Sequence, residues 1–218
     1  MRKILSLLFL LFIAVTASSK TFRLSIEPGY GFYDMGKLHQ LQDLAVNFHT
    51  GLGIKAVEEF PPFYNQSGSI LWYVTPDLLF GFTTEFLSTG ARNSAKDYSG
   101  DYKLDMLVNG ILYGLETEYN FRLLPDLRYF VNMKAGKINS TLDMNEKFVV
   151  ANTELINERD SIKDDNSFIE PSAGLRYEIN KSFSISVSAG YLLDIDASND
   201  KFINWSGFQL KAGVAFSF

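Results

Sequence analysis

The sequence predicts an all-β protein, an eight-stranded antiparallel up-and-down β-barrel that crosses a membrane. Apolar and polar residues alternate over several segments of about a dozen residues each, which is the pattern of strands with one apolar face. A short apolar segment suited to export opens the chain. No later segment approaches the roughly 18 uninterrupted apolar residues of a membrane-spanning helix, so we expect strands to cross the membrane.

The start of the chain is interpreted as a signal peptide. Two basic residues precede the apolar run from Ile4 to Val15, and small residues follow at a cleavage point near Ala17. We therefore expect residues 1–17 to be a signal peptide and residues 18–218 to form one barrel domain, located in the cell outer membrane.

Composition excludes several classes of function. The 218 residues include no cysteine, which removes disulfides, thiol nucleophiles and thiolate metal sites. A formal net charge of -5 offers no basic surface for nucleic acid. Mean hydropathy is close to zero, which contradicts a helical membrane protein but suits a barrel, because its outward apolar and inward polar residues cancel.

Eight strands are expected, joined alternately by short and long connections. The predicted strands cover residues 21–33, a segment ending at 70–74, a segment from 78 to about 89, then about 102–121, about 127–140, 167–180, 183–193 and 204–218. The short turns are residues 75–77, 122–126 and 180–182. The long extracellular loops are expected at about 34–62, 90–101, 141–166 and 195–203. An even number of strands with this alternation places both termini in the periplasm.

The first four strands follow from alternation. In residues 21–33 the apolar residues stand at even positions and face outward, opposite small or polar residues at odd positions. In the third strand Phe80, Phe82 and Phe86 face outward. The fourth strand changes phase near Asn109-Gly110, where we expect a β-bulge.

The last four strands keep the same alternation. Tyr129, Val131 and Met133 face outward in the fifth strand, and the sixth and seventh alternate apolar residues with serine, glycine and charged residues. The final strand places six apolar residues, from Phe208 to Phe218, on one face and ends with an aromatic residue. An apolar face of this length is the face expected to contact lipid.

One region is ambiguous between strand and helix. Residues 44–56 alternate like a strand, yet Leu38, Leu41, Ala45 and Phe48 also fit one side of a helix. A single extra strand would move the turn at residues 75–77 to the wrong side of the membrane. We therefore predict a helix over residues 36–48, with a ten-stranded barrel as the alternative.

Charged residues at membrane level all fall on the inward face of the predicted strands. They are Arg23, Glu27, Glu85, Glu116, Glu118, Lys134, Arg176, Glu178 and Lys211. A lipid-facing Lys or Arg near the membrane midplane would cost about 2 to 4 kcal/mol, so this sorting supports the assignment.

Six of these residues are predicted to form a charge network that fills the lumen. Three acids meet three bases near mid-barrel: Glu27, Glu85, Glu116, Lys134, Arg176 and Lys211. The interior of an eight-stranded barrel is only just wide enough for side chains, so we expect a closed lumen. The alternative is a narrow charged channel.

The chain resembles the small bacterial outer-membrane β-barrels, of the type of the outer membrane protein A membrane domain and the OmpX-like proteins. The resemblance covers essentially the whole mature chain and depends on Leu71-Trp72-Tyr73-Val74 before Thr75-Pro76-Asp77-Leu78, Ser88-Thr89-Gly90-Ala91-Arg92 with Asp97-Tyr98-Ser99-Gly100, and Phe216-Ser217-Phe218. It implies that Phe216 and Phe218 form the C-terminal signal read by the barrel-assembly machinery. The family includes structural, adhesive, evasion and enzymatic members, so the resemblance implies architecture rather than activity.

We predict that the protein is not an enzyme and that it has a structural or surface-interaction role, carried by its extracellular loops. An outer-membrane lipid-modifying enzyme is an alternative, but His39 and His49 both lie in the first long connection and pair with no serine and acid by spacing. A periplasmic lipocalin-like carrier is another, and would place Glu27, Lys134 and Lys211 on the exterior.

No catalytic, cofactor or metal site is predicted. Residues 194–200 resemble the start of a calcium loop but lack the glycine and the glutamate that such a loop requires. The expected partners are outer-membrane lipid, lipopolysaccharide and the barrel-assembly machinery, with no nucleic acid, and we expect a monomer. The sequence identifies no extracellular partner.

Overall fold

The computed structural model describes residues 20–48, 63–96, 100–151, 153–196 and 203–218. The predicted signal peptide, residues 1–17, lies outside the described residues. The elements are β1 (Phe22–Tyr33), α2 (Gly36–Phe48), β2 (Phe63–Tyr73), β3 (Leu78–Lys96), β4 (Gly100–Arg122), β5 (Leu127–Val150), β6 (Thr153–Glu178), β7 (Phe183–Asp194) and β8 (Gly207–Ser217). Among these residues no helix is long and apolar enough to cross a membrane.

The eight strands form a closed ring. Each strand pairs antiparallel with the next, and β8 pairs with β1. The eight-stranded prediction is therefore confirmed for the described residues. The ten-stranded alternative is wrong because the eight strands already close the ring, and Gly36–Phe48 is a helix.

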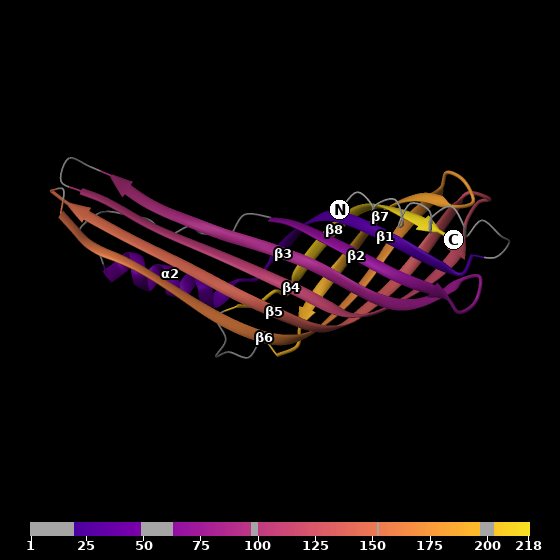
Figure 1. Cartoon of the computed structure of the whole chain (residues 1–218), viewed down its shortest axis with the longest axis horizontal. Helices are drawn as coiled ribbons and strands as arrows, with labels where there is room; N and C mark the ends of the chain where they lie inside the picture. Colours follow the sequence, from indigo (N-terminus) through magenta and orange to yellow (C-terminus); the bar gives the residue numbers. More distant parts are fainter. Residues whose placement is uncertain (1–19, 49–62, 97–99, 152, 197–202) are drawn as a thin grey trace, which may run out of the picture.

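All three short turns lie where the sequence predicts them. The hydroxyl of Thr75 accepts the backbone N–H of Leu78 at 3.0 Å, and the side-chain oxygen of Asn180 accepts that of Phe183 at 2.8 Å. Both contacts close a turn that begins with the residue supplying the side chain. The turns and the C-terminus lie at one end of the ring (Figure 1), called the turn end below.

Four strands are about twice as long as the other four. β3, β4, β5 and β6 have 19, 23, 24 and 26 residues, whereas β1, β2, β7 and β8 have 11 or 12. Beyond Leu87, β3 pairs only with β4, and before Phe168, β6 is paired along its length only with β5. The long strands thus leave the ring as a four-stranded sheet, called the projecting sheet, at the end opposite the turns (Figure 1).

The prediction of irregular loops at residues 90–101 and 141–166 is therefore wrong for the described residues. β3 continues to Lys96, β4 begins at Gly100, and β5 and β6 run through 141–150 and 153–166. The charges of this region suggest solvated loops, but a charged residue at every second position is equally compatible with a strand that has one face in water. Of the first predicted loop, residues 49–62 lie outside the described residues, as do residues 197–202 of the last.

The polarity of the two faces reverses between the ring and the projecting sheet. In the ring the outward side chains are apolar and the inward ones are largely polar. In the projecting sheet the outward face carries charges, and the inward face is apolar in the part next to the ring, whereas Glu146, Glu158 and Asp160 lie on the inward side farther out. The outward charged residues are Arg92, Asp105, Asp143, Lys147, Arg159, Lys163 and Asp165, and the inward apolar residues are Tyr102, Leu104, Met106, Val108, Ile138 and Leu142.

This reversal explains the apparent phase change in β4. The pairing of β4 with β3 and β5 is continuous through Asn109 and Gly110, so the predicted bulge is wrong. Even-numbered residues of β4 face inward on both sides of that point. The chemistry of each face changes there, while the geometry of the strand does not.

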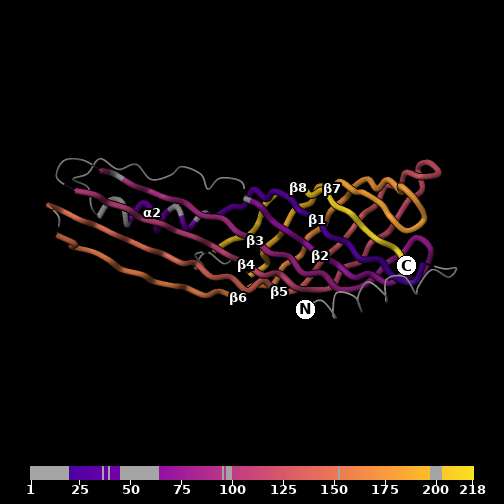
Figure 2. The backbone as a smooth tube through the Cα atoms, turned by 45° about the horizontal axis from the view of Figure 1, so that its top comes forward, coloured from indigo at the N-terminus to yellow at the C-terminus, as the bar shows by residue number. Residues whose placement is uncertain are grey.

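An apolar core fills the interior where the ring meets the projecting sheet. Helix α2 lies along the inner side of the projecting sheet (Figures 1 and 2), and Leu38 is fully buried in the core. The side chain of Gln42 donates to the Oδ1 of Asn93 on β3 at 2.7 Å. The helix prediction for residues 36–48 is confirmed, and the helix covers apolar side chains that would otherwise face water.

Trp205, in the segment that leads into β8, packs into the same apolar region. Its side chain is fully buried, its Nε1 donates to the hydroxyl of Ser140 at 2.8 Å, and its ring packs edge-on against Tyr33. The indole lies against Gly110, where a Cβ would come within 3.0 Å of the ring. Gly110 therefore leaves room for the indole and does not mark a bulge.

Candidate functional site

The polar part of the interior contains two groups of ion pairs. The first, called the middle cluster, consists of Glu85, Lys134, Glu170 and Lys211. The Nζ of Lys211 donates to Glu85 at 2.6 Å and to Glu170 at 2.8 Å. The Nζ of Lys134 lies 3.9 Å and 3.6 Å from the same two carboxylates. Two cations and two carboxylates from β3, β5, β6 and β8 therefore neutralise one another inside the ring.

Strand register explains the middle cluster. Lys134 on β5 lies directly opposite Glu170 on β6 and directly opposite Glu116 on β4. Because all inward residues of a closed ring converge on a narrow lumen, charges at similar depth meet across it even when their strands are not adjacent. All four side chains of the cluster are buried.

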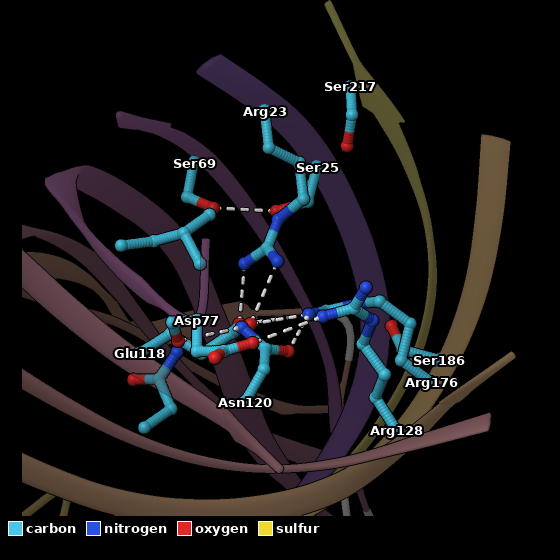
Figure 3. Close-up of polar contacts among 12 residues, drawn as sticks. Arg23, Ser25, Ser69, Asp77, Glu118, Asn120, Arg128, Arg176, Ser186 and Ser217 are labelled. Carbon is cyan, nitrogen blue, oxygen red and sulfur yellow. Dashed lines mark hydrogen bonds and ion pairs between the residues drawn. The ribbon is translucent and has the colours of Figure 1, made fainter. Parts of the chain in front are cut away.

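The second group, called the arginine cluster, lies nearer the turn end, and Figure 3 shows its side chains. Glu118 on β4 accepts hydrogen bonds from the Nη atoms of Arg23 on β1 and of Arg176 on β6, at 2.8 Å to Arg23 Nη1 and 2.9 Å to Arg176 Nη2. Arg176 also donates to the Oδ1 of Asn120 at 3.0 Å. Its guanidinium lies 4.5 Å above the ring of Phe130. Two guanidinium groups thus share one buried carboxylate.

A set of less buried ion pairs surrounds the mouth of the ring at the turn end. Glu178 pairs with Lys20 at 3.1 Å and with the Nε of Arg128 at 3.0 Å. Arg128 also reaches Asp77 of the first short turn at 3.5 Å. These contacts connect β5, β6 and the 75–77 turn.

The structure brings together only part of the predicted six-residue network. Glu85, Lys134 and Lys211 meet in the middle cluster, whereas Arg176 lies in the arginine cluster. Glu116 accepts a hydrogen bond from Asn132, and Glu27 accepts one from Ser186 at 3.4 Å. Within the described part of the chain neither carboxylate has an ion-pair partner.

Glu170 is the member of the middle cluster missing from the predicted set. Its inward direction follows from alternation in the sixth predicted strand, but its depth depends on the register of β5 with β6. That register is not set by the short connection between the strands, because the connection lies far from Glu170 and the pairing shifts between Phe148 and Val149.

The C-terminal strand ends among aromatic rings on the outer face. Phe218 stacks on Phe22 with ring centroids 4.6 Å apart and lies 4.8 Å from Phe216. The outward phase predicted for Phe216 and Phe218 agrees with this placement. β8 pairs with both β1 and β7, so these residues stand where the ring closes.

The other predicted or excluded sites can be placed only in part. Asp194, the first residue of the segment that resembles a calcium loop, accepts hydrogen bonds inside the ring from Asn166 at 2.7 Å. Within the described ranges no group of three metal-binding acids or histidines occurs. The side chains of His39 and His49, on which the enzyme alternative depends, lie outside the described part of the chain.

Comparison with known proteins gives similarity of architecture only. No protein-family model matches the chain, and no curated protein matches it. The chain is similar to Ail, the attachment invasion locus protein of Yersinia pestis, with 13% identity and a TM-score of 0.42 over 92% of this chain and 100% of Ail. It is similar to the N-terminal β-barrel domain of Pseudomonas aeruginosa OprF, with 14% identity and a TM-score of 0.43 over 92% and 100% of the two chains. The outer membrane protease OmpT from Escherichia coli matches with 10% identity and a TM-score of 0.45 over 93% and 99%.

Proposed function

We propose that the protein is a non-enzymatic outer-membrane β-barrel that exposes the projecting sheet outside the cell as an interaction surface. The observation that carries the proposal is the reversal of polarity along β3 to β6. A strand whose outward face changes from apolar to charged passes from one medium to another, and lipid followed by water fits that order.

The outer face of the ring supports insertion in lipid. Large apolar side chains such as Ile26, Phe82 and Leu115 are 54%, 59% and 46% exposed. They belong to a band that surrounds the ring, whereas soluble monomers rarely expose apolar patches above a few hundred Å². Aromatic residues border the band near the turn end, including Trp72 and Tyr119, and at its other edge, including Tyr191 and Phe208. A lipocalin-like carrier would have the opposite arrangement, with Lys134 and Lys211 outside, but both are buried.

The lumen is proposed to be closed. The middle cluster, the arginine cluster and the apolar core with Trp205 lie one above another inside the ring, and each brings side chains from several strands together. Breaking such buried ion pairs to admit water and ions would leave charges without partners, which is unfavourable.

The projecting sheet offers two features for binding. From Thr153 to Lys163, β6 pairs with β5 and with no other described strand, so its outer edge can accept an added strand. On the outward face a groove of about 760 Å³ is lined by Arg92, Asp105, Asp143 and Arg159 among others. These features support a role in contact with an external partner.

Membrane insertion and lumen closure are tested together on the full chain expressed in cells with an outer membrane. We expect the protein to stay in the pellet after carbonate extraction and to migrate faster on gels when unheated, as closed barrels do. Purified protein in planar bilayers should show no steady conductance. Release by carbonate would contradict insertion, and steady conductance would contradict the closed lumen.

The interaction surface is tested by shortening the β5–β6 hairpin. A variant lacking residues 143–160 should keep heat-modifiable migration and lose adhesion of expressing cells to surfaces or host cells. A matched variant, Glu178→Gln at the turn end, should keep both properties. Equal adhesion of all three proteins would overturn this role without affecting the proposed location.

A further inference from the structure

A small cavity lies at the turn end among an unusual number of cations. Lys20, Arg23, Arg128 and Arg176 line it, together with the carboxylate of Glu178. Its volume is about 30 Å³. A cavity needs roughly 10 to 15 Å³ to hold one water, so the space accepts about two water-sized atoms.

Cations outnumber carboxylates in the ion pairs around this cavity. In the described ion pairs these four cations share three carboxylates, Glu178, Asp77 and Glu118. Glu116, two residues along β4 from Glu118, accepts a hydrogen bond from Asn132 and forms no ion pair with either arginine. Buried cations that share few carboxylates gain from a further anionic partner, so a site of this kind favours an anion over water.

The two buried arginines also have donors that the protein does not use. Arg23 and Arg176 both contact Glu118 through their Nη atoms. The Nε of each is buried and has no hydrogen-bond partner, although each side chain is only 3% exposed. Nε with its neighbouring Nη forms the planar edge that binds a carboxylate through two parallel hydrogen bonds.

We propose that this cavity binds one carboxylate group, presented by an acidic peptide or a free carboxylic acid from the side of the turn end. Its two oxygens match the space for two water-sized atoms, and its charge gives the four cations a further anionic partner. Arg23 and Arg176 donate through Nε, while Arg128 and Lys20 attract the anion at the mouth. The inference that the molecule carrying the carboxylate comes from the periplasm rests on the proposed function, whereas the binding itself does not.

The proposal is tested with the mature chain refolded in detergent and labelled with ¹⁵N. Sodium acetate is titrated at constant ionic strength against sodium chloride, and the arginine Nε–H resonances are followed. Saturable shifts of Arg23 and Arg176 are expected with acetate, and none with the neutral acetamide. Shifts that do not saturate, or that acetamide reproduces, would overturn the site.

Variants distinguish this cavity from general attraction of anions. Arg128→Gln should weaken acetate binding about tenfold, because a charge-assisted contact is lost. Arg122→Gln, at an exposed position on the same end, should leave it unchanged. Lys20→Gln, which removes a less buried cation, provides a second test if Arg128→Gln fails to fold. Equal affinity in the folded Arg128→Gln or Lys20→Gln variant and in the unaltered protein would overturn the proposal.

The source of the carboxylate is distinguished with two peptide probes. If the natural ligand is a peptide, N-acetyl-alanyl-alanine with a free C-terminus should bind at least as well as acetate. The same peptide with a C-terminal amide should not bind. Binding of acetate without binding of the free peptide would overturn the hypothesis of a peptide ligand and favour a free carboxylic acid. Neither outcome depends on where the protein lies in the cell.

Discussion

The ring and the projecting sheet share four strands, β3 to β6, but the polarity of their faces is opposite. In the ring, β4 turns Leu115 and Tyr113 outward and Glu116 and Glu118 inward. In the projecting sheet the same strand turns Asp105 outward and Met106 inward. The positions alternate without interruption, so the chemistry of each face changes while the geometry of the strand does not.

This comparison separates two kinds of information in an alternating sequence. The two-residue period reports that the backbone is extended. The identity of the apolar face reports whether the outside is lipid or water. A reversal of that face inside one strand therefore predicts the level at which the strand leaves the membrane, here near Phe86 on β3, Ile111 on β4, Ala135 on β5 and Ile169 on β6.

The largest effect is expected from removing the charge of Glu118 inside the ring. Glu118→Gln leaves Arg23 and Arg176 without their shared carboxylate, and breaking a buried ion pair in this way costs about 3 to 5 kcal/mol. The matched change in the projecting sheet, Glu158→Gln, removes an exposed charge and should have little effect. Guanidinium unfolding from lipid vesicles measures both. Similar stability of the two variants would contradict the buried arginine cluster.

A smaller effect separates the two outer faces. Leu115→Lys places a cation on the outward face of the ring, where it should cost about 2 to 4 kcal/mol. Ser161→Lys places the same cation on the outward face of the projecting sheet, opposite Asp143, and should change stability by less than about 0.5 kcal/mol. A tolerated lysine at position 115 in vesicles would argue against lipid contact there.

The junction between the two regions is tested through Trp205. Trp205→Phe removes the hydrogen bond to the buried Ser140 and should cost about 1 to 2 kcal/mol. Trp72→Phe on the outer face of the ring loses no described hydrogen bond and serves as the control. The loss of stability in vesicles should be confined to the first variant, and equal losses would mean that the Trp205 contact adds nothing.

The smallest effect is a pH dependence confined to the projecting sheet. Burial alone would raise the pKa of Asp105, but hydrogen bonds from Arg92 and Lys103 outweigh it and hold that pKa below its ordinary value of 3.8. A lowered pKa means that the ion pairs stabilise the fold above about pH 3.8 and that this contribution is lost as the pH falls through the pKa of the folded state.

Asp105→Asn should therefore be slightly less stable than the unaltered protein at pH 7 and equally stable near pH 2. Unfolding curves at both pH values measure the difference. A difference that persists unchanged at pH 2 would assign it to something other than the charge of Asp105.

Much of the ring can be predicted from the sequence. Its strands are bounded by tight turns such as Thr75-Pro76-Asp77, and a tight turn sets the register of the two strands it joins. Alternation gives the inward direction of Arg23, Glu85 and Lys211, and the tight turn at residues 75–77 also sets the register of Glu85 with β2. The exact pairing of charges depends also on the register around the whole ring. This explains why the predicted network lacks Glu170 and includes Arg176, which lies in the arginine cluster.

The projecting sheet is harder to predict from the sequence. Leu104 and Met106 are apolar residues at even-numbered positions of β4, and in the ring these positions face inward. They do not fit a strand whose outward face is apolar along its whole length. If lipid is assumed to surround the whole strand, they therefore suggest a bulge or a loop. The role of Gly110 depends on Trp205, which is distant in sequence. Such a contact leaves no local pattern that sequence reasoning could detect.

The central claim is that the outward face of β4 passes from lipid to water between Ile111 and Asp105. Because the chain has no cysteine, single cysteines at Leu115, Ile111 and Asp105 can each carry a nitroxide spin label in lipid vesicles. We predict that the label at position 115 collides with dissolved oxygen and not with a water-soluble nickel complex, and that the label at position 105 shows the reverse. Equal access of the nickel complex to both positions would contradict the account.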